Sequence, residues 1–194
     1  MISMEKGIHL DFSDIYSLSE LYAMSDDKGK PLNSIFPAIY MWGWCDEAHI
    51  FHPYYVGQTS NIHKRTWEHV RNLHGGAYTI FDKDYLTSGQ YSNTKDNQQN
   101  HISKRLYIPS SLFGMKRFFE TDVQKNVKWL TENFRITWAN TSGFAQFNKD
   151  LEKYVANRIG AHRIGATVKG KSKFGINDIA VTGNPRVIEL LTKK

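Results

Sequence analysis

Two runs of strand-forming residues, followed at once by a capped helical segment, constrain the fold of this chain most strongly. The runs 36–44 and 49–56 are rich in Ile, Tyr, Trp and Phe, and only four residues separate them. Such a short polar connection favours an antiparallel hairpin. Segment 60–74 predicts a helix, because Ser60 or Asn61 can cap its start and a pair of glycines follows its end.

The helix expected over 60–74 has an apolar face with a polar stripe beside it. At 100° per residue one face collects Ile62, Thr66, Val70 and Leu73. Arg65, His69 and Asn72 form a second stripe along the edge of that face, from which polar side chains can point into a cleft. Lys64 and Glu68 are expected to face water.

Further periodic segments indicate a mixed α+β domain. Apolar residues recur at helical spacing over 12–24, and segment 123–133 is also helical in pattern. A strand with alternating apolar residues covers 134–138, and a last helix spans 144–159. The polar stretch 87–101 is typical of a loop.

Composition excludes several classes of protein. A hydrophobic share of 40% and an aromatic share of 13% are incompatible with a disordered chain. The longest apolar stretch, Ile35–Cys45, is far shorter than the roughly 20 residues that a membrane-spanning helix needs. Cys45 is the only cysteine, so no intrachain disulfide and no cysteine-cluster zinc site can form. We therefore expect a cytoplasmic protein with no membrane partner.

The charge pattern points to a polyanion partner. The net charge of +6 combines three basic and eight acidic residues in 1–47 with 22 basic and 11 acidic residues in 48–194. A compact body with this excess suggests nucleic acid. Basic and aromatic residues interleave in 104–107 and 116–119, where they can hold phosphates or enter a groove. Alternatively, the aromatic residues belong to the core of a helical cap and only the basic ones are exposed.

One motif matches a phosphate-binding loop but lacks its structural context. Residues 165–172 fit the pattern G-x-x-x-x-G-K-[ST] letter for letter. The pattern works only between a buried strand and the start of a helix, and no helix start follows here. We expect a basic loop without a nucleotide cofactor, in which Lys169, Lys171 and Lys173 can contact a DNA backbone.

A more specific pattern joins the predicted hairpin to the helix that follows it. Its parts are Ala38-Ile39-Tyr40, Tyr55-Val56-Gly57, and then Arg65 and His69 on the helix. This order resembles the GIY-YIG nuclease superfamily. Four features depart from the family pattern: Ala38 stands for a glycine, Val56 stands for an isoleucine, the hairpin connection is longer than usual, and 82 residues separate His69 from Glu152, the candidate for the family's glutamate.

The resemblance implies a fold and a division of the chain. It covers residues 36–74 closely and 134–180 loosely, which would form the catalytic core. The implied fold is α+β, a small three-stranded antiparallel sheet flanked by helices. Residues 1–194 would then be one domain, with a helical N-terminal extension over 1–34 and a DNA-recognition insertion over 75–133.

The resemblance also implies the site residues, which are Tyr40, Tyr55, Arg65, His69, Glu152 and Asn177. Glu152 would hold one Mg²⁺ ion, which Mn²⁺ could replace, and Arg65 suits a phosphate oxygen. Tyr55 would position the water or the phosphate, and Asn177 would brace the site. The general base is either Tyr40, which needs cationic neighbours to ionise, or His69, which titrates near neutral pH.

A standalone type II restriction endonuclease is the member that the chain resembles most, because little sequence follows Asn177. It would cut double-stranded DNA to 5′-phosphate and 3′-hydroxyl ends, as a homodimer on a palindromic site and with a prokaryotic or phage origin. The alternatives are a phage or mobile-element nuclease of loose specificity and an inactive DNA-binding protein. The candidate DNA contacts are Lys64, Lys104, Arg105, Lys116, Arg117, Lys169, Lys171 and Lys173.

Overall fold

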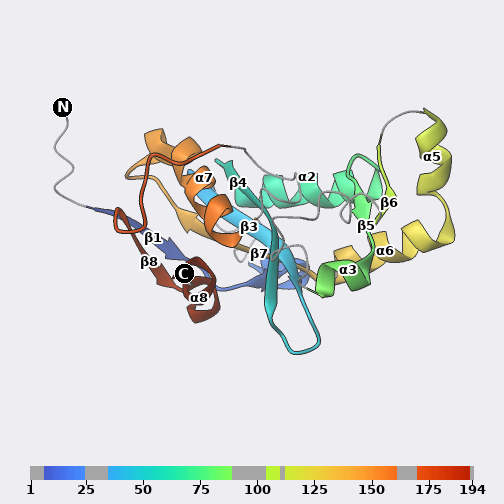
Figure 1. Cartoon of the computed structure of the whole chain (residues 1–194), viewed down its shortest axis with the longest axis horizontal. Coiled ribbons are helices and arrows are strands. Elements are labelled where there is room, and N and C mark those ends of the chain that lie inside the picture. Colours follow the sequence, from blue (N-terminus) through green and yellow to red (C-terminus); the bar gives the residue numbers. More distant parts are fainter. Residues whose placement is uncertain (1–6, 25–34, 89–103, 110–111, 161–169, 193–194) are drawn as a thin grey trace.

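A mostly antiparallel sheet with helices on both faces forms the centre of the protein (Figure 1). The computed structural model describes residues 7–24, 35–88, 104–109, 112–160 and 170–192. The strands run across the sheet in the order β4 (Phe51–Thr59), β3 (Ala38–Cys45), β7 (Phe134–Asn140), β1 (Ile8–Phe12) and β8 (Ile179–Gly183), and β2 (Tyr16–Ser17) pairs with β7 beside this path. The flanking helices are α1 (Leu18–Ala23), α2 (Ile62–His74), α7 (Asn148–Ile159) and α8 (Pro185–Thr192).

The predicted hairpin is confirmed as the antiparallel pair β3–β4. Its register places Tyr40 opposite Gly57 and Trp42 opposite Tyr55. A β-bulge follows, because the next residue of β3, Gly43, pairs with Pro53 and leaves Tyr54 as an extra residue. The bulge lets the two successive tyrosines of β4 contact the ring of Trp42 together.

The expected three-stranded sheet is wrong, because the N-terminal and C-terminal segments add strands to it. The helix predicted over 12–24 is confirmed only for Leu18–Ala23, where Ser17 forms a capping box with Glu20. Residues 8–12 form a strand instead, with alternate residues buried. The helical N-terminal extension expected over 1–34 is therefore corrected to two strands and a short helix among its described residues.

β8 forms the edge of the sheet opposite β4, and α8 follows it in the chain. The sequence patterns predicted neither element. β8 runs parallel to β1 and pairs with it along all five residues. α8 then packs its buried Val187 and Leu191 into the core beneath this pair. Both strands are only five residues long, and their pairing over a common core stabilises them.

Two hydrophobic cores lie on the two faces of the sheet. One contains residues of β1, β3 and β4 with α7 and α8, including Leu10, Ile39 and Leu151. The other lies beneath α1 and α2 and includes Tyr40 and Trp42. Because side chains of a strand alternate between faces, Tyr40 and its neighbours Ile39 and Met41 belong to different cores.

The predicted insertion forms a third core at one end of the molecule (Figure 1). It contains β5 (Ile80–Phe81), α3 (Lys83–Thr87), β6 (Arg105–Tyr107), α5 (Leu112–Phe118) and α6 (Thr121–Glu132), which confirms the helix expected over 123–133. Tyr107 and Phe118 are buried in this core, whereas Phe119 is 69% exposed. Most of the loop expected over 87–101 lies outside the described residues.

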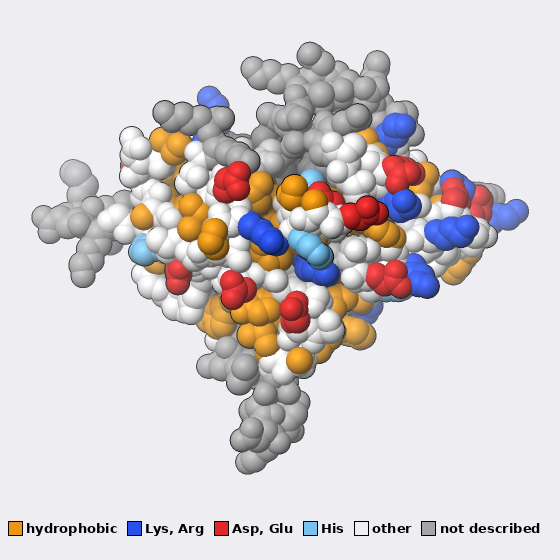
Figure 2. Space-filling model, turned by 90° about the horizontal axis from the view of Figure 1, so that it is seen from below, with side chains coloured by type: hydrophobic (Ala, Val, Ile, Leu, Met, Phe, Trp, Pro, Cys, Tyr) orange, Lys and Arg blue, Asp and Glu red, His pale blue; other side chains and the backbone are white. Residues whose placement is uncertain are grey.

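The surface of the protein mixes the two charge signs. Figure 2 shows acidic and basic side chains interspersed on one face, without a continuous basic field. None of the helices that the structure describes is both long and apolar enough to cross a lipid bilayer.

We predict that Gly183→Ala destabilises the junction between β1 and β8. Gly183 has φ +99°, and a Cβ there would overlap the backbone carbonyl oxygen of Phe12. Strain of this kind costs about 1–3 kcal/mol, and we expect urea unfolding to show a loss of that size. Gly143→Ala is the matched control, since a Cβ at Gly143 meets no atom within 4 Å. Equal stability of the two variants would contradict the prediction.

Candidate active site

A buried hydrogen-bonded chain joins β3 to α2. The hydroxyl of Tyr40 lies 2.9 Å from Nε of Arg65 and 2.8 Å from Nε2 of His69. Arg65 and His69 are four residues apart on α2, so both point toward the same strand. Tyr40 and His69 are each 0% exposed. His69 is thus part of the buried face of α2, closer to the core than the polar stripe predicted from the sequence.

The hydrogen bonds around Tyr40 determine where its proton lies. Arginine can only donate, so Nε of Arg65 donates to the phenol oxygen. The buried phenol proton then needs an acceptor, and Nε2 of His69 is the one in reach. The single ring proton of the neutral His69 then lies on Nδ1, which donates to the hydroxyl of Tyr78 at 2.8 Å. We assign this tautomer because it gives the phenol of Tyr40 and both ring nitrogens of His69 a hydrogen-bond partner.

Burial keeps the side chains of Tyr40 and His69 uncharged at neutral pH. Desolvation lowers the pKa of His69 to about 3, and the positive charge of Arg65 acts in the same direction. Desolvation also raises the pKa of Tyr40 above its ordinary value, as does the nearby Tyr55, while the hydrogen bond from Arg65 opposes this. The resting state is therefore a neutral phenol bonded to a neutral imidazole.

Gly57 allows the two motif tyrosines to meet. The rings of Tyr40 and Tyr55 stack with centroids 6.0 Å apart, and the Tyr55 ring also contacts His69 at 5.2 Å. A Cβ at Gly57 would overlap the hydroxyl of Tyr40 and lie 2.7 Å from Cε1 of Tyr55. Only glycine at this register position leaves room for both rings.

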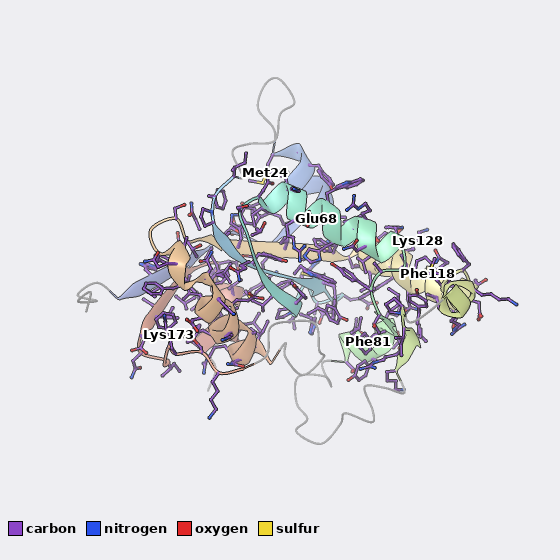
Figure 3. The ribbon with its side chains drawn as sticks, turned by 90° about the horizontal axis from the view of Figure 1, so that it is seen from above. Met24, Glu68, Phe81, Phe118, Lys128 and Lys173 are labelled. Carbon is purple, nitrogen blue, oxygen red and sulfur yellow. The ribbon has the colours of Figure 1, made fainter. Side chains whose placement is uncertain are left out.

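Glu152 reaches the same region from the opposite face of the sheet. Figure 3 shows α2, marked by Glu68, and α7 on opposite sides of the strands. Oε2 of Glu152 accepts a hydrogen bond of 3.0 Å from Nε2 of Gln58, which lies on the edge strand β4. Gln58 follows Gly57 directly with its side chain on the opposite face, so Glu152 and the tyrosine pair flank the same edge strand from its two sides.

The carboxylate of Glu152 is poorly compensated. Its residue is only 8% exposed, and burial raises its pKa above the ordinary value. The hydrogen bond from Gln58 and the positive charges of Arg65 and Lys153 oppose this shift. Glu152 takes part in no ion pair within the described ranges. A bound cation would supply the missing compensation.

The donor set for a metal is small. Across the described residues, no three His, Cys, Asp or Glu side chains gather closely enough to hold an ion. One carboxylate is still sufficient for Mg²⁺, which keeps several waters and takes further ligands from substrate phosphates. The second carboxylate oxygen of Glu152 and the side chain of Gln58 therefore fit a single, largely hydrated ion.

The remaining predicted site residue, Asn177, lies apart from this group. It is exposed in the turn before β8, and the structure shows no hydrogen bond from its side chain to any of the other five. Nearby, Phe174 packs on Phe147 at the start of α7. The structure thus joins four of the six residues, Tyr40, Tyr55, Arg65 and His69, by direct contacts, and it places Glu152 across the same edge strand, where the charge of Arg65 acts on it.

The candidate DNA contacts differ in their local partners. Arg117 is bonded to the carboxylates of Glu120 and Asp122, and Lys173 pairs with Asp150 at 3.2 Å. Arg105 lies over the ring of Phe81. The candidates that are exposed and make no ion pair within the described ranges are Lys64, Lys104, Lys116 and Lys171. Lys169 lies outside the described residues.

Three residues of the site were missed by sequence reasoning. Tyr78 follows the glycine pair after α2, where no periodic pattern marks it. Gln58 stands next to Gly57 in the motif, but no local pattern indicates that it bonds to Glu152, which is 94 residues away. Glu68 was expected to face water, yet its Oε2 accepts a 2.8 Å bond from Nη1 of Arg65 and so orients the guanidinium.

Comparison with known proteins returns no match: neither a protein-family model, nor a curated protein, nor a solved structure matches this chain. The chemistry of the site must therefore be judged from its own geometry.

We predict that His69 makes the protein less stable in mild acid. The unfolded chain takes up a proton near pH 6.5, whereas folded His69 does so only near pH 3. Between these values the unfolded state binds more protons, so lowering the pH costs up to about 1.4 kcal/mol per pH unit. Urea unfolding from pH 7 to 4 should show this loss in the wild type and a smaller slope in His69→Gln.

His74→Gln controls for replacing a histidine on the same helix, since His74 is exposed. Parallel pH profiles for the wild type and His69→Gln would show that the folded imidazole is not kept neutral by burial.

Proposed function

We propose that this protein is an endonuclease of the GIY-YIG type that hydrolyses phosphodiester bonds of DNA. The observation that carries the proposal is the contact of Tyr40 with Tyr55, Arg65 and His69 beside β4, with Glu152 bound to Gln58 on the other side of that strand. Phosphodiester hydrolysis needs an activated water, a cation on the phosphate and help for the leaving alkoxide. This group has a candidate for each task.

Arg65 is the residue suited to the phosphate. Its side chain is 31% exposed although Nε is bonded to Tyr40 and Nη1 to Glu68. The permanently charged, planar guanidinium matches phosphate oxygens, and these two bonds hold it in one orientation. A phosphate bound there would also lie beside the hydroxyl of Tyr40.

The geometry favours Tyr40 and His69 acting in series as the base. Both rings are enclosed, and Nε2 of His69 already accepts from Tyr40, so a proton from a water bound at the phenol oxygen would reach His69 only through Tyr40. In the proposed step Tyr40 takes a proton from the attacking water and passes its own proton to Nε2 of His69. Nδ1–H of His69 stays bonded to Tyr78 throughout and stabilises the imidazolium that forms.

Glu152, with Gln58 beside it, would hold Mg²⁺. When bound, the ion would act as a Lewis acid on the phosphate and the leaving oxygen. The raised pKa of Glu152 supports this role, since a buried carboxylate short of compensating charge gains most from a cation.

Sequence-specific cleavage by a homodimer is the finer part of the proposal. One such site cuts one strand, so a double-strand cut at a palindrome needs two copies. Digestion of plasmid DNA with Mg²⁺ and with a chelator tests this directly. Discrete fragments would support a restriction-type enzyme, a smear would indicate a nuclease of loose specificity, and binding without any cutting would indicate a DNA-binding protein.

We predict that Glu152→Gln loses cleavage while gaining stability. Loss of the metal ligand should lower the rate by more than about 100-fold, the equivalent of several kcal/mol. Because the folded pKa of Glu152 is raised, its ionisation destabilises the protein as the pH rises, and the amide removes that cost at pH 7. Cleavage rates and urea unfolding at pH 7 measure both effects.

Glu132→Gln, at an exposed glutamate of α6, is the matched control and should cut like the wild type. Undiminished cutting by Glu152→Gln would remove Glu152 from the site.

We further predict that Tyr40→Phe slows cleavage by about 10²–10⁴-fold, the usual contribution of a general base. The ring still packs against Tyr55, so DNA binding by the folded variant should persist. Tyr22→Phe, at an exposed tyrosine of α1, is the control. Single-turnover cleavage and DNA binding in Ca²⁺ separate the chemical step from affinity, and full turnover by Tyr40→Phe would contradict the serial base.

A further inference from the structure

A cavity of about 330 Å³ lies directly beside the candidate active site. Its walls include aromatic side chains from β3, β4 and the inserted segment, together with one arginine: Trp42, Tyr54, Tyr55, Tyr78, Phe81 and Arg105. The volume falls at the lower end of the range of small-molecule sites, which is about 300–1,000 Å³. It therefore suits a ligand the size of one or two aromatic rings.

The walls are suited to a flat, uncharged ring. The bulge in β4 presents two successive tyrosine rings to this space, and Phe81 faces Tyr54 with ring centroids 6.2 Å apart. Leu73 and Leu86 complete the apolar lining. Arg105 is exposed, with its guanidinium 5.8 Å from the centroid of Phe81, so it can stack on a ring or contact a phosphate.

The cavity shares two walls with the catalytic group. The ring of Tyr55 lines it and also stacks on Tyr40, and Tyr78 lines it while its hydroxyl binds Nδ1 of His69. One aromatic side chain therefore separates a ring in the cavity from the residues proposed to hold the phosphate. A nucleotide has the same layout, with a flat ring one sugar away from its phosphate.

We propose that this cavity receives one unstacked nucleobase of the bound DNA, from a nucleotide next to the phosphodiester bond that is cut. The proposal rests on the nuclease function proposed above and deepens it. Stacking between aromatic side chains holds bases that have left a helix, and contacts to such a base provide specificity. The inserted segment would thereby contribute to DNA recognition through Tyr78, Phe81 and Arg105.

Filling the cavity from its own wall tests the proposal. Ala77 lines the cavity and is exposed, and its backbone N–H bonds to Asn72, a contact that any side chain preserves. Ala77→Phe should therefore fold, which thermal unfolding checks, and Ala77→Ser is the matched small control. On a duplex carrying the mapped cut site, in Ca²⁺, we expect Ala77→Phe to bind about 10- to 100-fold more weakly and Ala77→Ser like the wild type.

A scan of abasic sites distinguishes a base in the cavity from a general clash with DNA. Duplexes are made with one abasic nucleotide at each position around the cut. The loss caused by Ala77→Phe should disappear at one position next to the cut, since no base needs the cavity there, and persist at the others. A loss that persists at every position, or no loss on the intact duplex, would overturn the proposal. A wild type that neither binds nor cuts DNA would instead refute the nuclease function itself.

Discussion

The hydroxyl of Tyr40, bonded to Arg65 and His69 inside the core, is the interaction on which the site depends. These two hydrogen bonds connect helix α2, which carries Arg65 and His69, to strand β3 in the sheet. Because the phenol is fully buried, each of its hydrogen bonds must be made, and this selects one tautomer of His69. The phenol oxygen of Tyr40 thus helps to orient the guanidinium of Arg65, and it directs the phenol proton toward Nε2 of His69.

The architecture of the sheet explains why the site lies where it does. β1 and β8 extend the sheet on the side away from β4, so β4 remains an edge strand. An edge lets a helix on each face bring side chains around the same strand, which is how Glu152 of α7 reaches Gln58 while α2 supplies Arg65. The inserted segment then adds its own core at the end of α2 and forms the far wall of the neighbouring cavity.

Burial gives the site chemical properties that no single residue has alone. The same exclusion of water lowers the pKa of His69 to about 3 and raises the pKa of Glu152 and Tyr40. Tyr40 and His69 are therefore held in their neutral forms at pH 7, and burial makes the ionised form of Glu152 costly in stability. Storing this cost at one edge of an otherwise apolar core is typical of functional sites.

The sequence by itself determined the local elements whose patterns are complete within a few residues. The hairpin and the capped helix with Arg65 and His69 four residues apart both depend on short-range propensity and capping. The tertiary structure decided what needs partners distant in the chain: the pairing of β1 with β8, the bond between Gln58 and Glu152, and the contact of Tyr78 with His69. These depend on burial and hydrogen bonding between segments 9 to 171 residues apart, and no local pattern encodes which segments will meet.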